Sequence, residues 1–378
     1  MAFFMGPLSL SSARHFHPSM PGTGSQKINT LQCLRAVAVL LVVYAHVIDL
    51  QSAKGGLSRQ AGFYYLQNFG AAGVDIFFVI SGFIITIISQ QYRSAVGLFI
   101  LKRLVRIVPL YWLVSGCLMI YACFTREGFY DTYTILKTFV FLPLFDKDRF
   151  APPVLFVGWT LSFEIFFYLV VALWMKINPK KYLVLTTLFF LCCMLFNTVV
   201  PSANVLLTFA GNPILLEFLL GMLAGVIYMK AKTIRPVYLW ALMIAGIAWL
   251  LTTIFTGYQN ISEMPFIINS KLSLLRVVLW GIPAALLVTA VVLLEKNRKL
   301  TAGKPWVAVG DASYSIYLVH APFLLFTYMG WERSGIISTV PPDLLIIITL
   351  VLCILAGYTF YRLVERPLLG WLQRSIGK

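Results

Sequence analysis

Apolar side chains form long runs along most of this chain, and charged residues, Pro or Asn separate one run from the next. A helix needs about 20 apolar residues to cross the hydrocarbon core of a bilayer. The pattern therefore predicts an all-α polytopic membrane protein with about ten transmembrane helices. The predicted spans are residues 31–50, 70–90, 98–123, 154–176, 182–200, 212–230, 237–257, 272–294, 308–329 and 344–364.

Three further segments, 1–28, 133–145 and 368–378, are too short or too polar to be transmembrane helices. Residues 133–145 are apolar but short, and we expect them to be re-entrant or interfacial. Residues 1–28 are polar, and their early apolar run is too short for the core of a signal peptide. The sequence therefore predicts a disordered cytoplasmic tail over 1–28, one transmembrane domain over 29–367 and a short cytoplasmic tail over 368–378.

Composition supports a membrane protein and excludes a soluble one. Of the 378 residues, 60% are hydrophobic and 12% are charged, whereas roughly a quarter of the residues of a soluble domain are charged. The net charge of +16 does not indicate a nucleic-acid partner, because the cations lie between apolar runs rather than on one polar face.

The distribution of positive charge predicts the orientation of the chain. If the N-terminus is cytoplasmic, most of the 30 lysines and arginines fall in loops on that side, as the positive-inside rule requires. Both termini are then expected in the cytoplasm. Nine cations, Arg276 among them, are expected outside or near the outer helix ends, and Arg35 lies inside the first predicted span.

The cysteine pattern indicates neither a disulfide framework nor a metal site. The 6 cysteines lie in or at the ends of apolar runs, without CxxC or Cys/His spacing. We therefore expect no metal. The chain also shows no convincing internal repeat of the kind that many transporters carry.

Ionisable residues inside the predicted spans are few, and each is a candidate for function because charge in hydrocarbon costs a few kcal/mol or more. Arg35 and His46 are 11 residues apart and therefore share one helix face, separated by about 16 Å. One cavity could contact both side chains; the alternative is a snorkelling arginine and a histidine bonded to a backbone carbonyl. The remaining candidates are Asp75, Glu164, Glu217 and His320.

A cluster of cations opens the third predicted span. Lys102, Arg103 and Arg106 lie at its cytoplasmic end, and Arg103 and Arg106 are one turn apart. Guanidinium groups bind phosphates through paired hydrogen bonds, so a phosphorylated cytoplasmic ligand would suit this site. Plain positive-inside anchoring explains the same spacing.

The fourth predicted span carries polar residues in the run GWTLSFEIFFYLV, which contains Trp159, Ser162, Glu164 and Tyr168. Glu164 and Tyr168 are i,i+4 neighbours and could form a hydrogen bond. Glu164 is either a protonated structural residue or the group that orients a histidine on another helix.

The ninth predicted span contains GDASYSIYLVHAP, in which Ser313, Tyr317 and His320 share one face. Such a stripe is typical of a helix that lines water or substrate, although hydrogen bonds between helices are an alternative. Asp75 is a candidate partner for an arginine. Glu217 has no neighbour in the sequence that explains it.

Taken together, these motifs resemble the acyltransferase 3 family of integral-membrane acyltransferases. The resemblance covers nearly the whole chain after residue 28. Six motifs occur in order: LRAVAVLLVVYAH at 34–46, GVDIFFVISGFI at 73–84, KRLVRIVPLYW at 102–112, WTLSFEIFFY at 159–168, SYSIYLVHAP at 313–322 and VERP at 364–367.

The resemblance implies a reaction and roles for these residues. Similar proteins acetylate hydroxyls of exopolysaccharides, O-antigens, peptidoglycan and macrolide sugars, with acyl-coenzyme A as the donor. We therefore expect a bacterial inner-membrane O-acyltransferase that moves an acetyl group from acetyl-CoA to a glycan or lipid-linked sugar. His46 and Glu164 would be catalytic, with His46 as general base. Arg35, Arg103 and Arg106 would bind coenzyme A, and the substrate-binding or supporting residues would be Asp75, Trp159, Ser162, Tyr168, Ser313, Tyr317 and His320.

Other functions remain compatible with the sequence. A carrier or flippase for a lipid-linked sugar or polar solute could use the same buried charges as a relay, and an acyltransferase could act on a small glycosylated metabolite. Some similar proteins have a fused periplasmic hydrolase-like domain. None follows here, so we expect direct transfer or a separate partner. A second copy of the chain and polysaccharide-export proteins are candidate partners, besides membrane lipids.

Overall fold

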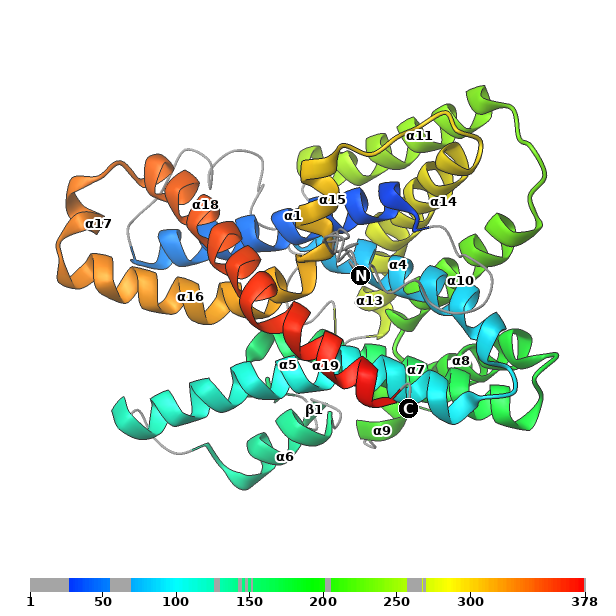
Figure 1. Cartoon of the computed structure of the whole chain (residues 1–378), viewed down its shortest axis with the longest axis horizontal. Coiled ribbons are helices and arrows are strands. Elements are labelled where there is room, and N and C mark those ends of the chain that lie inside the picture. Colours follow the sequence, from blue (N-terminus) through cyan, green and yellow to red (C-terminus); the bar gives the residue numbers. More distant parts are fainter. Residues whose placement is uncertain are drawn as a thin grey trace, which may run out of the picture.

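The protein is a bundle of helices (Figure 1), as the sequence predicts. The computed structural model describes residues 27–54, 69–125, 130–141, 145–146, 149–150, 152–200, 205–256, 267 and 270–376. The predicted tail over 1–28 therefore lies almost entirely outside the described residues. The predicted tail over 368–378 is helical as far as Ile376.

The long helices follow the apolar runs closely. They are α1 (Asn29–Lys54), α4 (Ala72–Ser89), α5 (Val96–Thr125), α7 (Trp159–Ile177), α8 (Tyr182–Val199), α10 (Leu215–Lys230), α11 (Pro236–Phe255), α14 (Ile282–Lys296), α16 (Ser313–Arg333) and α18 (Pro342–Phe360).

Shorter elements connect or extend these helices. They are the 3-10 turns η1 (Gln90–Tyr92) and η2 (Phe156–Gly158), the helices α6 (Thr132–Val140), α9 (Val205–Ala210), α13 (Ser270–Arg276), α15 (Lys304–Asp311), α17 (Ile336–Thr339) and α19 (Arg366–Ile376), the π-helical segments η4 (Val277–Gly281) and η5 (Tyr361–Glu365), and the antiparallel pair β1 (Phe145–Asp146) and β2 (Arg149–Phe150).

Among the described residues, nine helical segments are long and apolar enough to cross a membrane. They match nine of the predicted spans. The remaining predicted span, 308–329, corresponds to α16, which begins only at Ser313 because α15 ends at Asp311. With 21 residues α16 has the length of a span, but its histidine, tyrosines and serines lower its hydropathy. Several of these polar side chains are buried inside the bundle, which explains why a membrane helix tolerates them.

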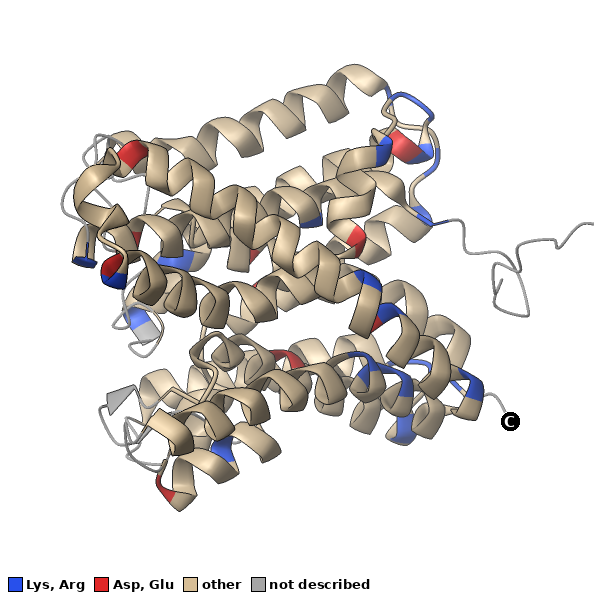
Figure 2. Ribbon diagram, turned by 60° about the vertical axis from the view of Figure 1, so that its left-hand side comes forward, with Lys and Arg blue, Asp and Glu red and all other residues tan. Residues whose placement is uncertain are grey.

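Within the predicted interfacial segment 133–145, residues 133–140 belong to the short helix α6 (Thr132–Val140), and residues 142–144 lie outside the described residues. The 9 residues of this helix rise about 14 Å, which is too short to cross a bilayer. Asp131 caps the helix, since its carboxylate accepts a hydrogen bond from the Thr134 amide at 2.9 Å. Charged residues elsewhere lie mainly toward the two ends of the bundle (Figure 2).

Helix α1 is central in the bundle and contacts α4, α14, α15, α16 and α18. Its first turn is held by Glu295 of α14, whose carboxylate accepts hydrogen bonds from the amides of Asn29 at 3.0 Å and Thr30 at 2.8 Å. These donors have no partner within the helix, so the carboxylate satisfies the free end of α1.

Small residues allow α4 and α10 to pack backbone against backbone. A Cβ atom added at Gly82 would lie 2.0 Å from the Phe218 carbonyl oxygen, and one added at Gly221 would lie 2.1 Å from the Val79 carbonyl oxygen. Glycines at helix crossings permit this approach in membrane proteins. The two glycines therefore determine the distance between α4 and α10.

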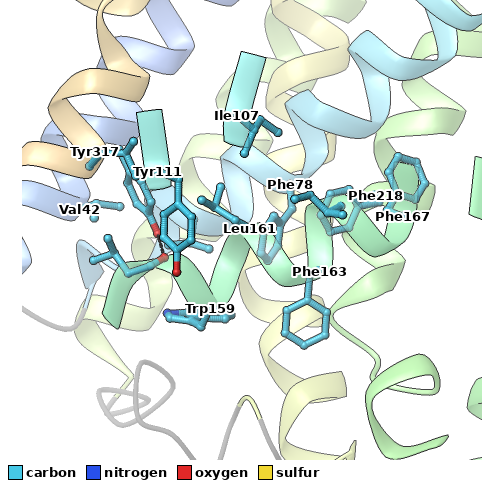
Figure 3. Close-up of a cluster of buried hydrophobic side chains, with 14 of the residues drawn as sticks. Val42, Phe78, Ile107, Tyr111, Trp159, Leu161, Phe163, Phe167, Phe218 and Tyr317 are labelled. Carbon is cyan, nitrogen blue, oxygen red and sulfur yellow. Dashed lines mark hydrogen bonds between the residues drawn. The ribbon is translucent and has the colours of Figure 1, made fainter. Parts of the chain in front are cut away.

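Aromatic rings fill the space between α4, α7 and α10 (Figure 3). Phe218 stacks on Phe78 with ring centroids 4.6 Å apart, and Phe167 lies 4.8 Å from Phe218. Tyr317 and Tyr111 lie toward the other end of the cluster. This packing joins the helices that carry the polar residues described below.

Substituting Gly221 by Ala is expected to lower thermal stability in detergent, because the added methyl group collides with backbone that cannot turn away. Overpacking of this kind costs roughly 1–3 kcal/mol. Gly116→Ala in α5 is the matched control, since a Cβ atom there has nothing within 4 Å. Equal unfolding midpoints for the two variants would contradict the proposed close crossing.

Candidate active site

A cavity lies between α1, α4, α5, α7 and α16, and these helices carry most of the predicted site residues. It encloses about 820 Å³, including the open space at its mouth. Thr160 and Tyr168 both line it from α7. Since they are eight residues apart, the cavity extends about 12 Å along that helix.

The three predicted cofactor-binding arginines meet in this cavity. Arg35 lines it from α1, and Arg103 and Arg106 line it from α5. The guanidinium of Arg35 donates to Gln32 at 3.3 Å, and the buried Nε of Arg103 has no hydrogen-bond partner among the described residues. Lys102 lies apart, since it does not line the cavity and its Nζ donates to the Tyr92 hydroxyl at 3.1 Å.

A second cavity, of about 1190 Å³ including the space open to solvent, adjoins the first, because Arg35 and Arg106 line both. Glu365 also lines it, is buried, and accepts a hydrogen bond from Ser315. Our sequence analysis did not single out Glu365 as a site residue. The VERP motif contains it, but only the fold shows that this carboxylate faces two arginines.

Glu164 is held by two hydroxyl groups on the cavity wall. Its Oε1 accepts a hydrogen bond from Ser81 at 2.8 Å and a short one from Tyr168, so the predicted pairing of Glu164 with Tyr168 is confirmed. In the described part of the chain, neither histidine hydrogen-bonds to this carboxylate. Of the two alternatives left open for Glu164, direct contact with a histidine is therefore not seen among the described residues.

The partner of His46 is His320. His46 Nδ1 lies 2.9 Å from the Val42 carbonyl oxygen and 3.3 Å from His320 Nε2. His320 Nδ1 lies 3.2 Å from the Ile316 carbonyl oxygen. A carbonyl oxygen only accepts, so in the neutral rings both Nδ1 atoms carry the proton. His46 Nε2 is then left with a free lone pair and can act as a base.

Tyr317 separates the cavity from the two histidines. Its hydroxyl donates to the Val157 carbonyl oxygen at 2.8 Å and lies 2.9 Å from the Thr160 hydroxyl. Its ring lines the cavity and lies 5.8 Å from the His320 ring between centroids. Within the described structure His46 and His320 do not line this cavity, which corrects the expectation that one cavity contacts both Arg35 and His46.

The other predicted residues divide between the cavity wall and the core. Ser313 lines the cavity, and its buried hydroxyl has no hydrogen-bond partner among the described residues. Trp159 instead packs its ring edge-on against Phe78 and Phe163. Ser162 is buried but does not line the cavity. Ser313 therefore faces this cavity, whereas Trp159 and Ser162 do not line it.

Asp75 pairs with an arginine, as predicted, but does not line the cavity. Its carboxylate accepts hydrogen bonds from Arg276 Nε at 3.0 Å and from a terminal nitrogen at 2.7 Å. Both side chains are buried. Arg276, which the sequence predicts outside or near an outer helix end, is buried in the bundle, and its partner Asp75 lies 201 positions away in the sequence.

Glu217 lies beside this ion pair. Its side chain is fully buried, and neither carboxylate oxygen accepts a hydrogen bond from the described residues. Asp75 and Glu217 are neighbouring carboxyl groups, and two such groups can share a hydrogen bond only when one of them carries a proton. Asp75, Glu217 and Arg276 therefore form a closed structural cluster with one guanidinium for two carboxyl groups.

The arrangement could bind an anion at one end and supply a base at the other. Arg35, Arg103 and Arg106 place three guanidinium groups around one space, with Glu164 and Glu365 as the nearest carboxylates. An anion in the cavity would balance the excess positive charge and use the donors that lack partners. At the other end, beyond Tyr317, His46 offers a basic nitrogen. No group of metal ligands occurs among the residues that the structure describes.

Replacement of Arg276 by Met is expected to destabilise the protein by roughly 3–5 kcal/mol, because it leaves the Asp75 carboxylate buried without a counter-ion. Glu217→Gln keeps the size of the side chain and should unfold close to the wild-type temperature. Thermal unfolding in one detergent compares them. A loss in Glu217→Gln as large as that in Arg276→Met would show that Glu217 also carries an indispensable charge.

Comparison with known proteins identifies the relatives of this chain. It is 31% identical over 312 residues to the exopolysaccharide production protein ExoZ of Rhizobium meliloti, covering 79% of this chain and 90% of that protein. It is 26% identical over 370 residues to the O-acetyltransferase OatA of Staphylococcus aureus, covering 89% of this chain and 56% of that protein.

A third relative is the peptidoglycan O-acetyltransferase OatA of Listeria monocytogenes, which is 27% identical over 330 residues, covering 79% of this chain and 50% of that protein. This chain thus spans about half the length of the two O-acetyltransferases. No solved structure matches the chain. A family model described as an acyltransferase domain matches residues 28–362, so this multi-pass membrane protein belongs to the acyltransferase 3 family.

Proposed function

We propose that this protein transfers an acetyl group from acetyl-CoA to a hydroxyl group of a polysaccharide or lipid-linked sugar. The observation that carries the proposal is the placement of three arginines in one cavity that ends at Tyr317, beside the His46 and His320 pair. The relatives named for exopolysaccharide production and O-acetylation support the choice of acceptor.

Coenzyme A suits the cavity because its phosphates and its thioester lie at opposite ends of a long, flexible arm. Arg35, Arg103 and Arg106 would hold the phosphates by bidentate hydrogen bonds. The arm would then lie along the wall of α7, between Tyr168 and Thr160. The thioester would reach the histidines beside Tyr317. The Tyr317 hydroxyl would have to break its hydrogen bonds to Val157 and Thr160 and rotate away to let the thioester pass.

Transfer requires a base at the acceptor hydroxyl. His46 Nε2 takes the hydroxyl proton while the hydroxyl oxygen attacks the thioester carbonyl carbon. The carbon–sulfur bond breaks, and the thiolate of coenzyme A takes the proton from His46 Nε2. An acetyl ester and free coenzyme A result. His320 Nε2 accepts a hydrogen bond from His46 Nδ1 and thereby stabilises the charged ring during the step.

The orientation in the membrane follows from the same proposal. Lys27, Asp311 and Gln373 line the second cavity, and Lys27 and Gln373 are near the two ends of the described chain. The cation-rich end of the bundle lies close to the C-terminus (Figure 2). We place this end in the cytoplasm, where acetyl-CoA is made, and the protein in the bacterial inner membrane. The acceptor would then approach His46 from the outer side.

Arg106→Ala is expected to weaken coenzyme A binding by about 10- to 100-fold, since it removes charged hydrogen bonds to phosphate. Calorimetric titration of the purified protein with coenzyme A measures this effect. Lys102→Ala is the matched control, because Lys102 lies four residues away on α5 but outside the cavity. Undiminished binding by Arg106→Ala would remove this residue from the donor site.

His46→Ala is expected to reduce acetyl transfer by about 10²- to 10⁴-fold, the usual contribution of a general base. The assay follows labelled acetyl-CoA with the protein in vesicles. His320→Gln, which keeps an acceptor near His46 Nδ1, should lose less activity than His320→Ala. A wild-type protein that neither binds coenzyme A nor turns over acetyl-CoA would favour a carrier instead of an enzyme.

A further inference from the structure

Phe156 places an exposed aromatic ring directly beside His46. The two ring centroids are 5.2 Å apart and the rings meet edge to face at 64°. Phe156 is 39% exposed, whereas the nearby Trp159 and Phe163 are buried. His46 itself is half-buried, and neither it nor Phe156 lines the donor cavity. The histidine therefore has a second, partly open side, and Phe156 borders it.

The turn that carries Phe156 is held rigidly. The Val157 carbonyl oxygen accepts the hydroxyl of Tyr317, and the Gly158 amide donates to the Leu155 carbonyl oxygen at 2.8 Å. A Cβ atom at Gly158 would lie 2.5 Å from the Tyr111 ring, so the turn packs closely against that side chain. A ring on such a turn has a fixed position before any ligand binds.

The surroundings of this side of His46 become polar along α1. Asp49 is exposed and lies three residues beyond His46, on the same helix face. At the end of α1, Lys54 forms a partly exposed ion pair with Glu332 at 2.9 Å. Charged groups in these positions require water rather than hydrocarbon, so the ring of Phe156 borders an aqueous approach to His46.

From these contacts we infer that Phe156 and Asp49 form the acceptor subsite, and that the ligand is a sugar ring; the inference rests on the proposed function. A sugar ring has apolar C–H groups on its face and hydroxyls around its rim. Its face would lie against Phe156, one hydroxyl would reach His46 Nε2, and another would donate to the Asp49 carboxylate.

This placement separates the two substrates. The donor comes through the arginine-lined cavity, and the acceptor comes past Phe156. The hydrogen bonds of Tyr317 and Thr160 lie between the two approaches, and the Tyr317 hydroxyl must move for the thioester to reach the acceptor at His46. Phe156 is thus assigned to acceptor binding, and its loss should weaken transfer to a sugar more than it weakens attack of water on the thioester.

Two activities of each variant test the inference. Purified protein gives the His46-dependent hydrolysis of labelled acetyl-CoA without an acceptor, and membrane vesicles from the producing cells give label transferred to the polysaccharide fraction. For Phe156→Leu the ratio of transfer to hydrolysis should fall about tenfold, and Phe156→Tyr should restore it. Asp49→Asn should lower the same ratio. Phe196→Leu, at another exposed aromatic position on α8, should leave both activities unchanged.

The outcomes separate the inference from the function on which it rests. A wild-type protein with neither activity would refute the acyltransferase proposal itself. If the wild type is active, an unchanged ratio in Phe156→Leu overturns the acceptor subsite. A parallel loss of both activities also overturns it, because the ring would then serve only to hold His46 in place.

Discussion

The structure depends on one constraint: a charge buried in a membrane protein must find a partner or face a polar space. Asp75 and Arg276 satisfy it completely, with two hydrogen bonds between fully buried groups. Arg35, Arg103 and Arg106 satisfy it differently, since they surround a cavity and the Nε atom of Arg103 has no hydrogen-bond partner among the described residues. The closed pair stabilises the bundle, whereas the open cluster keeps its capacity for a ligand.

The packing of the helices explains where the cavity can exist. Gly82 and Gly221 bring α4 and α10 together without space between them, and the aromatic cluster around Phe218 fills the space toward α7. Between α1, α5 and α16 the side chains are long, polar or held by hydrogen bonds, and the cavity described above lies among them. Tyr317 closes its inner end through Val157 and Thr160, so the basic nitrogen of His46 is kept apart from the arginines.

The sequence was most informative about features that a single helix must satisfy by itself, such as its length in the bilayer or a polar residue in an apolar run. Apolar runs predicted the spans because bilayer thickness is a local requirement on length. The polar residues of α16 stood out for the same reason, although they also lowered its hydropathy below that of the other spans. Spacing along one helix correctly paired Glu164 with Tyr168. It did not reveal the contact between His46 and His320, which are 274 residues apart.

The sequence by itself thus determined the helices, their number to within one, the polar motifs and the family, because each is encoded in local composition and spacing. Only the tertiary structure decided which polar residues meet. In the folded bundle Arg276 pairs with Asp75, and Glu365 lies near two arginines. Trp159 packs in the core, and Tyr317 lies between Arg35 and His46. The physical reason is that partners on different helices are selected by helix packing, and packing depends on the whole bundle at once.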